Sequence, residues 1–278
     1  MPPLSAVGAP APEVTRTPDV TQSTAPVTFS VDERTAQYDA YWSNVDICYP
    51  HYPTIRHRKR FIVNSLRQMP GIGEKTVFDV GCGEGTLLQH VQQRFGLSEE
   101  SMGGSDISLG AIERARGKVP HAYFRAGAYP QLGRTFDVMI CSEVIEHTEE
   151  YAKLIGWMYE HLSAGGRLIL TTQAGKIHAS DRYTGHTQHF VLSELVPLLQ
   201  KTGFTIVSAR SWGFPLFTLQ KYLTDIRFDH VREKYLEGTL SVRKRLLFSL
   251  TTLAYYIHDL IPFGPQIYIV AQKPTEQA

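Results

Sequence analysis

Cysteine is scarce in this 278-residue chain, and its scarcity excludes two common ways of stabilising a small domain. The three cysteines are Cys48, Cys82 and Cys141. An odd number at such wide spacings matches neither a disulfide framework nor a zinc knuckle. Because disulfide frameworks belong to oxidising compartments, we predict a reducing environment and a cytoplasmic location.

The chain also lacks an excess of charge of either sign and lacks a long apolar run. Its 28 Lys and Arg face 27 Asp and Glu, for a formal net charge of +1. Proteins that bind duplex nucleic acid through phosphates usually carry a basic excess, so we expect no duplex partner. Binding of a short RNA end is an alternative that the charge leaves open.

A membrane-spanning helix needs about 20 apolar residues. The nearest stretch, Leu246–Ile261, is interrupted by His258 and Asp259, so we expect no transmembrane segment. Composition leaves the oligomeric state unknown.

The order of the predicted elements indicates an α/β fold. From Thr76 onward, short apolar segments alternate with amphipathic segments of about 10 to 15 residues, which is typical of βαβ units. We therefore predict a Rossmann-like, seven-stranded, mostly parallel sheet with helices on both faces. The predicted strands are 76–80, 101–106, 122–126, 136–142, 167–172, 205–209 and 266–271, and the predicted helices are 36–42, 56–67, 86–95, 109–117, 151–162 and 192–202.

Five segments follow from this pattern. Residues 1–30 are rich in Pro, Ala and Thr without a basic start, so we expect a disordered leader rather than a signal peptide. We expect a helical N-terminal cap at 31–70, the core at 71–216, a helical insertion or lid at 217–262, and the last strand and tail at 263–278.

The insertion contains the run Arg243-Lys244-Arg245, which precedes Leu246 and Leu247. This pattern fits a packed lid helix, which we favour, or an amphipathic helix lying on a membrane surface. Aromatic residues are dense in both the cap and the insertion. They can line an apolar pocket for a small-molecule acceptor or belong simply to the core.

A glycine-rich turn follows the first predicted strand. The strand ends at Val80, and Gly81, Gly83 and Gly85 then open a helix. Glycine is needed where the backbone turns sharply against a ligand. The spacing G-x-G-x-G, with a threonine next, departs from the dinucleotide fingerprint and counts against a dehydrogenase. Asp106 ends the next strand about 20 residues on, where a carboxylate can accept both ribose hydroxyls of a nucleoside.

These segments resemble the class I S-adenosylmethionine-dependent methyltransferases, including the ubiquinone-pathway O-methyltransferases, over about residues 56–210 and the last strand. Asp79–Gly85 is similar to the first motif of the family, Ser105–Ser108 to its ribose motif and Phe136–Glu143 to its fourth-strand motif. The resemblance implies S-adenosyl-L-methionine as cofactor and S-adenosyl-L-homocysteine as product. The implied cofactor residues are Asp79 at the amino group, Gly81, Gly83 and Gly85 around the methionine and adenosine, Asp106 at the ribose, Ile107 at the adenine, and Ser142 and Glu143.

One departure from the family lies after the third strand. The family often has an acidic residue there facing the adenine amino group, whereas this chain has Ala126-Gly127-Ala128. The resemblance therefore implies that backbone atoms contact the adenine.

Titratable side chains cluster after the fourth and fifth strands. Glu143, Glu146 and His147 are spaced i, i+3 and i+4 and share one face if this segment is helical. His186 and His189 follow the fifth strand. Both segments should meet at the carboxyl edge of the sheet, where open α/β sheets bind ligands.

Three interpretations of this cluster stay open. In the one we favour, His147 or His186, with Glu146 beside them, is the base for in-line O-methylation of a small molecule, because histidine titrates near neutral pH. In the second, Glu143, Glu146, His147 and one of the other histidines bind a divalent Mg, Mn or Zn ion, as the resemblance of E-x-x-E-H to ubiquinone-pathway and small-RNA 3′-end methyltransferases implies. The acceptor would then be a catechol or an RNA 3′-end ribose. In the third, Glu146 and His147 only cap a helix.

A non-catalytic adenosine-cofactor-binding module is a further alternative. Convergent titratable groups count against it, since a silent binder has no need of them.

Overall fold

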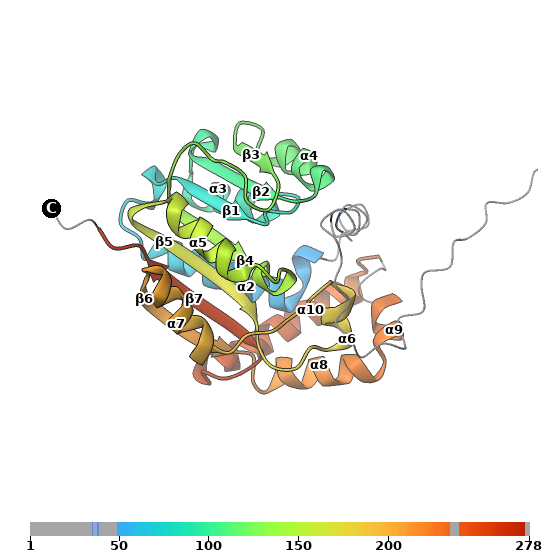
Figure 1. The fold of residues 1–278 in the computed structure, drawn as a ribbon. Coiled ribbons are helices and arrows are strands. Elements are labelled where there is room, and N and C mark those ends of the chain that lie inside the picture. Colours follow the sequence, from blue (N-terminus) through green and yellow to red (C-terminus); the bar gives the residue numbers. More distant parts are fainter. Residues whose placement is uncertain (1–34, 36–37, 39–48, 234–238, 276–278) are drawn as a thin grey trace, which may run out of the picture.

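The computed structural model describes residues 35, 38, 49–233 and 239–275 (Figure 1). The leader expected at 1–30 lies outside the described residues, and so does most of the helix expected at 36–42. No helix of the described part is long and apolar enough to cross a membrane.

One seven-stranded sheet forms the centre of the molecule, in the order β3-β2-β1-β4-β5-β7-β6. Neighbours among β1 to β5 pair in parallel, and β7 is antiparallel to both β5 and β6. The predicted mostly parallel, seven-stranded sheet is therefore confirmed. The strands are β1 (Val77–Val80), β2 (Met102–Asp106), β3 (Tyr123–Ala126), β4 (Phe136–Ser142), β5 (Leu162–Gln173), β6 (Thr205–Trp212) and β7 (Gln266–Gln272).

Helices cover both faces of the sheet and bury two separate apolar clusters. Successive side chains of a strand point to opposite faces. On β4, Val138 and Ile140 join the cluster beneath α2, α3 and α4, whereas Met139 and Cys141 join the one beneath α5 and α7. The helices are α2 (Pro53–Arg67), α3 (Thr86–Phe95), α4 (Leu109–Lys118), α5 (Tyr151–His161) and α7 (Leu192–Thr202).

β5 is longer than the sequence indicated. The fifth strand was expected to begin at Arg167, after the glycines at 165 and 166, but β5 starts at Leu162, directly after α5. The pairing register with β4 shifts here, because Phe136 pairs with Leu162 and Val138 with Arg167. Gly165 has φ +75°, so the glycines form a bulge within the strand rather than a turn before it.

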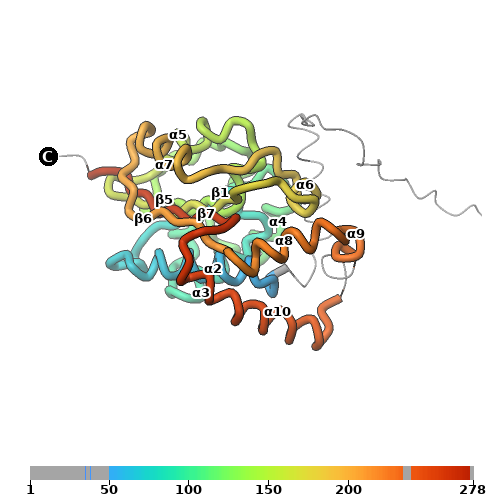
Figure 2. Tube along the Cα trace, turned by 90° about the horizontal axis from the view of Figure 1, so that it is seen from below, coloured from blue at the N-terminus to red at the C-terminus, as the bar shows by residue number. Residues whose placement is uncertain are grey.

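The segment between β6 and β7 is helical in its described part. It contains α8 (Leu216–Ile226), α9 (Phe228–Val231), α10 (Val242–Ala254) and a 3₁₀ turn (Tyr255–Leu260). Figure 2 shows α10 alongside α2, and α8 contacts the 3₁₀ turn that follows α10. The α8 helix also contacts α6 (Ala179–Tyr183), a short helix in the loop after β5.

Candidate functional site

The glycine-rich turn between β1 and α3 has a backbone that only glycine adopts easily. Gly81, Gly83 and Gly85 have φ of +69°, +52° and +79°. A Cβ on Gly81 would lie 2.5 Å from Cγ2 of Val144, and one on Gly85 would lie 2.9 Å from Cα of Ala115. The absence of a side chain at Gly85 therefore lets the start of α3 pack directly on α4. Because none of the three glycines has a side chain, the turn is narrow at the carboxyl edge of the sheet.

Two buried carboxylates adjoin this turn. Asp106 accepts the backbone N–H of Gly83 through Oδ2 and that of Ser108 through Oδ1, both at 2.9 Å. Burial, and then the charge of Asp106, raise the pKa of Asp79 well above its usual range. A cationic ligand with ribose hydroxyls would offset this concentration of negative charge. The narrow turn and the two carboxylates thus fit S-adenosylmethionine, with its ammonium and sulfonium groups.

The other expected cofactor residues lie around the same edge. Ile107 is half-buried after β2, and Gly127 donates its N–H to the Asp106 carbonyl at 2.9 Å, which holds the end of β3 beside β2. Ser142 at the end of β4 is hydrogen-bonded to Thr171, with 2.9 Å between the hydroxyl oxygens. Their contacts with a cofactor stay predictions.

Glu143 has a different setting from the one the sequence suggested. It has φ +59°, the one positive φ found outside glycine in the described chain, so it does not continue into a helical turn. Glu143 therefore does not share a face with Glu146 and His147. Its carboxylate is held instead by four side chains from three elements: Arg58 on α2 (2.9 Å), Thr171 and Gln173 on β5 (3.1 and 2.7 Å) and Gln266 on β7 (2.6 Å).

Glu146 and His147 lie in a short 3₁₀ turn, Ile145–His147, after β4. Glu146 is fully buried, and its Oε2 accepts the Thr172 hydroxyl at 2.7 Å. No described residue forms a hydrogen bond with its Oε1. Burial, and then the charge of Glu143, raise the pKa of Glu146 well above its usual range, which favours the protonated, neutral acid.

The loop after α6 brings His186 onto this turn. The N–H and the hydroxyl of Thr187 both donate to the Glu146 carbonyl, at 3.0 and 3.1 Å. The His147 and His186 rings then meet edge to face with centroids 4.6 Å apart. Ligand-type atoms of Glu146, His147 and His186 lie within 4.8 Å of one another, so the three candidate catalytic residues do converge.

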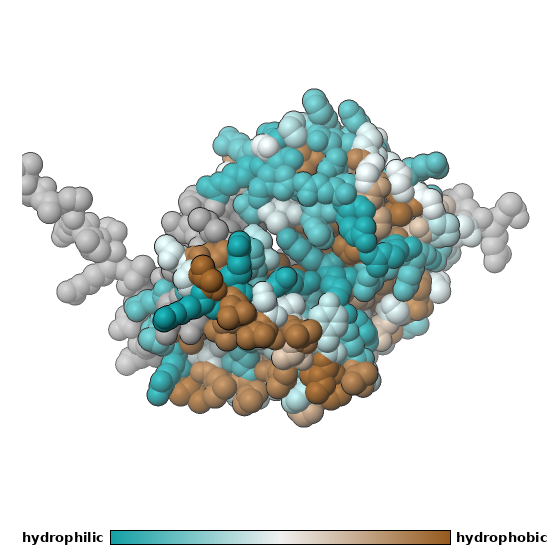
Figure 3. Space-filling view, turned by 180° about the vertical axis from the view of Figure 1, so that it is seen from behind, coloured by the Kyte–Doolittle hydropathy of each residue, from teal (hydrophilic) through white to brown (hydrophobic). Residues whose placement is uncertain are grey.

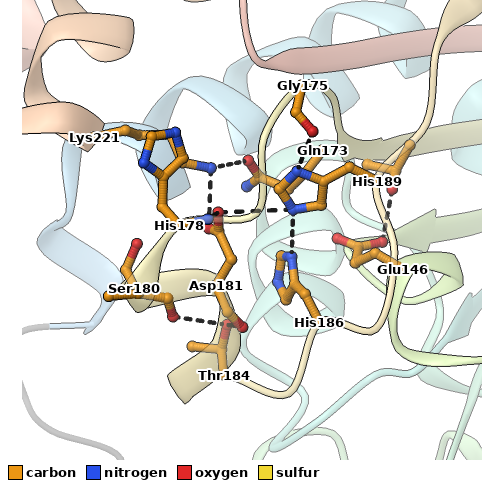
Figure 4. Close-up of polar contacts among 12 residues, drawn as sticks. Glu146, Gln173, Gly175, His178, Ser180, Asp181, Thr184, His186, His189 and Lys221 are labelled. Atoms are coloured by element: carbon orange, nitrogen blue, oxygen red, sulfur yellow. Dashed lines mark hydrogen bonds and ion pairs between the residues drawn. The ribbon is translucent and has the colours of Figure 1, made fainter. Parts of the chain in front are cut away.

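His186 and His189 form a hydrogen-bonded chain of imidazoles (Figure 4). His189 Nδ1 lies 3.1 Å from the Gly175 carbonyl, which can only accept, so this nitrogen carries the proton. Burial lowers the pKa of His189, so the ring is neutral and its Nε2 is an acceptor. His186 Nδ1, 3.0 Å from that Nε2, is therefore the donor. The lone pair of His186 is left on Nε2.

Burial, followed by the neighbouring His147, strongly lowers the pKa of His186. The ring is therefore neutral across the physiological pH range. A neutral imidazole with a lone pair on Nε2 suits either a proton acceptor or a metal ligand.

Asp181 and Lys221 complete the site and were not identified from the sequence. Asp181 on α6 pairs with Lys221 on α8 at 2.9 Å, and its other oxygen lies 3.7 Å from His189 Nε2. The Lys221 ammonium also donates to Gln173 at 2.8 Å. Asp181, His186 and His189 form a second group of potential metal ligands within 4.8 Å. No spacing signal links Lys221 to Asp181 and Gln173, because three separate segments of the chain supply them.

Comparison with known proteins agrees with this geometry. A sequence model of a family described as a methyltransferase domain matches residues 55–209, more than half of the chain. The trans-aconitate 2-methyltransferase of Deinococcus radiodurans is 27% identical over 147 residues, which cover 52% of this chain and 54% of that protein. A ubiquinone biosynthesis O-methyltransferase of Pseudomonas paraeruginosa is 29% identical over 114 residues, covering 40% and 49%. The chain thus spans about half the length of these curated relatives.

Solved structures show the same fold at low identity. The phosphoethanolamine N-methyltransferase 2 of Haemonchus contortus, in complex with phosphomonomethylethanolamine and S-adenosylhomocysteine, superposes with a TM-score of 0.58 at 19% identity, covering 89% of this chain and 61% of that one. The acceptors named for these three proteins differ, so they do not specify the acceptor here. The family match, the glycine-rich turn and the sheet order together establish that the chain belongs to the class I S-adenosylmethionine-dependent methyltransferases.

Proposed function

We propose that the chain transfers the methyl group of S-adenosylmethionine to an oxygen of a small-molecule acceptor, with His186 as the base. The observation that carries this proposal is the imidazole chain, in which the Gly175 carbonyl orients His189 and His189 orients His186. A base needs a lone pair and a fixed direction, and this chain supplies both to Nε2 of His186.

The cofactor, when bound, supplies a methyl carbon activated by a sulfonium. The turn at Gly81–Gly85 and the carboxylates of Asp79 and Asp106 would hold and orient it. His186 would take the acceptor proton on Nε2 and share the resulting charge with His189 through their hydrogen bond. Asp181, 3.7 Å from His189, would stabilise that cation and offset the weakness of a base with a lowered pKa.

The acceptor would bind between the site and the two helical segments outside the core, at 31–70 and 217–262. Two contacts support this location. The Tyr38 ring lies edge to face with His147, with centroids 5.7 Å apart, and Lys221 of α8 reaches Asp181. The neutral overall charge and the match to a ubiquinone biosynthesis O-methyltransferase support a small oxygen acceptor.

A second candidate is a methyltransferase that depends on a divalent metal ion. The convergence of Glu146, His147 and His186 within 4.8 Å favours it, since one carboxylate and two imidazoles suit Zn or Mn. The ion would bind the paired oxygens of a catechol or a ribose. Glu143 would not be a ligand in this arrangement, because four other side chains hold its carboxylate.

One experiment separates the two candidates. Methyl transfer from labelled S-adenosylmethionine to a panel of phenols, catechols and carboxylic acids is measured before and after chelator treatment. The base proposal predicts that turnover survives chelation, whereas His186→Leu lowers it by roughly 10²–10⁴-fold while S-adenosylhomocysteine still binds. If turnover is lost on chelation and returns when Mn or Zn is added, the metal-dependent mechanism is established instead. Full activity of His186→Leu would refute both roles of this residue.

A further inference from the structure

An apolar face covers the outer side of α8, α10 and the turn that follows α10. Figure 3 shows hydrophobic side chains gathered over the lower part of the molecule, in the region of these helices. On α8 the face consists of Leu219, Tyr222, Leu223 and Ile226, and on α10 of Val242, Leu246, Leu250 and Leu253. Leu260 and Phe263 continue it after α10. All ten are exposed, and Val242, Leu260 and Ile226 reach 85%, 81% and 75%.

The spacing of these residues shows that they form stripes rather than isolated exposures. Positions 219, 222, 223 and 226 are spaced i, i+3, i+4 and i+7 along α8. The inner side of α10 is already occupied, because buried Phe248 packs against Tyr52 and the Thr252 carbonyl is hydrogen-bonded to His57 at 2.9 Å. The leucine stripe of α10 therefore points away from α2, and a patch of this kind marks an interaction surface.

The charges on the α10 part of this face are of one sign. Arg243, Lys244 and Arg245 occupy the first turn of α10, and the sequence has no Asp or Glu from Thr239 to Ile257. Cations at a helix N-terminus oppose the helix dipole, so the dipole does not account for this placement. Two carboxylates near the ends of α8 and α10 are engaged, because Asp225 bonds to His178 and Asp259 to Arg60. Asp229, after α8, is exposed and lies 3.7 Å from Arg232.

We propose that the chain docks on an anionic lipid surface through this apolar face, with α8 and α10 lying in the plane of the interface. On α10, leucines flanked by Lys and Arg without acidic residues match acyl chains below anionic headgroups. A second copy of the chain fits less well, because two apposed α10 helices would bring the same cations together, and α10 itself carries no carboxylate. Lys221, on the inner side of α8, contacts Asp181. The docked face therefore lies next to the candidate site.

The test is co-flotation of the full-length protein with vesicles of phosphatidylcholine alone and of phosphatidylcholine mixed with phosphatidylglycerol. We expect binding to the anionic vesicles, weakened by salt. Replacing Arg243, Lys244 and Arg245 by Gln should lower the partition coefficient on the order of 100-fold, at about fivefold per cation. The triple variant Leu246→Ser, Leu250→Ser, Leu253→Ser should lower it at least as much. Because the three leucines, Arg243 and Arg245 are exposed and Lys244 is only half-buried, both variants should keep their unfolding temperature and S-adenosylhomocysteine affinity.

Matched controls use exposed residues elsewhere. Arg114→Gln, Arg116→Gln and Lys201→Gln on α4 and α7 remove the same charge, and Leu109→Ser on α4 removes an exposed leucine. These controls should bind vesicles as the wild type does. Equal binding to both vesicle types, or equal loss in the control variants, would overturn the proposal. So would the absence of vesicle binding together with a dimer in light scattering that the leucine variant dissociates, since the face would then be covered by a second copy. None of these outcomes depends on which acceptor is methylated.

Discussion

Arg58 and Glu143 are joined by an ion pair of 2.9 Å that links α2 to the end of β4, and both side chains are largely buried, with 13% and 11% exposed. Glu143 also keeps a left-handed backbone that costs a non-glycine residue on the order of 1 kcal/mol or more. The polar contacts of its carboxylate are thus what holds this strained corner in place.

Arg58→Met should therefore destabilise the fold strongly. It leaves a buried carboxylate without its cation, and breaking a buried pair from one side costs about 3–5 kcal/mol. Adding Glu143→Gln should recover part of that loss, because the uncompensated charge is then removed. Urea unfolding of the two single variants and the double variant measures the coupling. Additive free-energy changes would show that the pair is not coupled.

Gly85→Ala should lower the free energy of unfolding by about 1–3 kcal/mol, because a left-handed φ and a close approach to Ala115 both oppose a side chain. Gly117→Ala in α4 is the matched control. Its Cβ would meet nothing within 4 Å, so it should be neutral or stabilise by roughly 0.4–1 kcal/mol. Thermal unfolding of both variants tests the pair, and equal losses would contradict the steric argument.

Asp106→Ala should weaken S-adenosylhomocysteine binding by at least roughly tenfold, since charge-assisted hydrogen bonds to the ribose hydroxyls are lost. Isothermal titration calorimetry measures the affinity. Glu113→Ala, an exposed acidic position on the neighbouring α4, removes the same charge and should leave the affinity unchanged. Unchanged affinity in Asp106→Ala would remove this residue from the cofactor site.

Glu146→Gln should flatten the pH dependence of stability. The pKa of Glu146 is raised in the folded state, so the wild type loses stability as the pH rises above the ordinary glutamate value toward the folded one. Glutamine stays neutral and keeps an oxygen for the Thr172 hydroxyl. Unfolding free energies near pH 5 and near pH 8 should therefore differ less in the variant. Glu150→Gln, on a surface carboxylate 58% exposed, is the control and should change neither value.

His189→Leu should lower turnover without preventing cofactor binding, because His186 loses the acceptor that fixes its tautomer. The lowered pKa values of His186 and His189 also predict that the wild type keeps its activity as the pH falls through 6.5, the ordinary histidine value. A pH–rate profile measured under saturating cofactor tests both statements. An acidic limb centred near 6.5 would show that a different histidine titrates in turnover.

Much of the fold was predictable because it depends on local chemistry. Alternating apolar segments predicted every strand of the sheet, and the spacing of Gly81, Gly83 and Gly85 predicted the turn after β1. The start of β5 was predicted too late in the chain, because the pair Gly165-Gly166 is equally compatible with a turn before the strand and with a bulge inside it. Only the pairing of Phe136 with Leu162 decides between them.

The candidate site was predictable in its members but not in their contacts. The titratable residues after β4 and β5 were identifiable, since the carboxyl ends of parallel strands share one edge. The contacts of Glu143 with Arg58 and Gln266 were not predictable, because those partners lie on α2 and β7. Likewise, the pairing of Asp181 with Lys221 depends on how α8 folds back against α6.

The sequence alone therefore determined the class of fold, the cofactor turn and the acidic residue that follows it. These depend on backbone geometry and periodicity within some 30 residues of chain. Tertiary structure alone decided which charges are paired, which ring nitrogen of His186 keeps the lone pair and which leucines of α10 remain exposed. Those properties depend on burial and on neighbours that the chain brings together from distant segments.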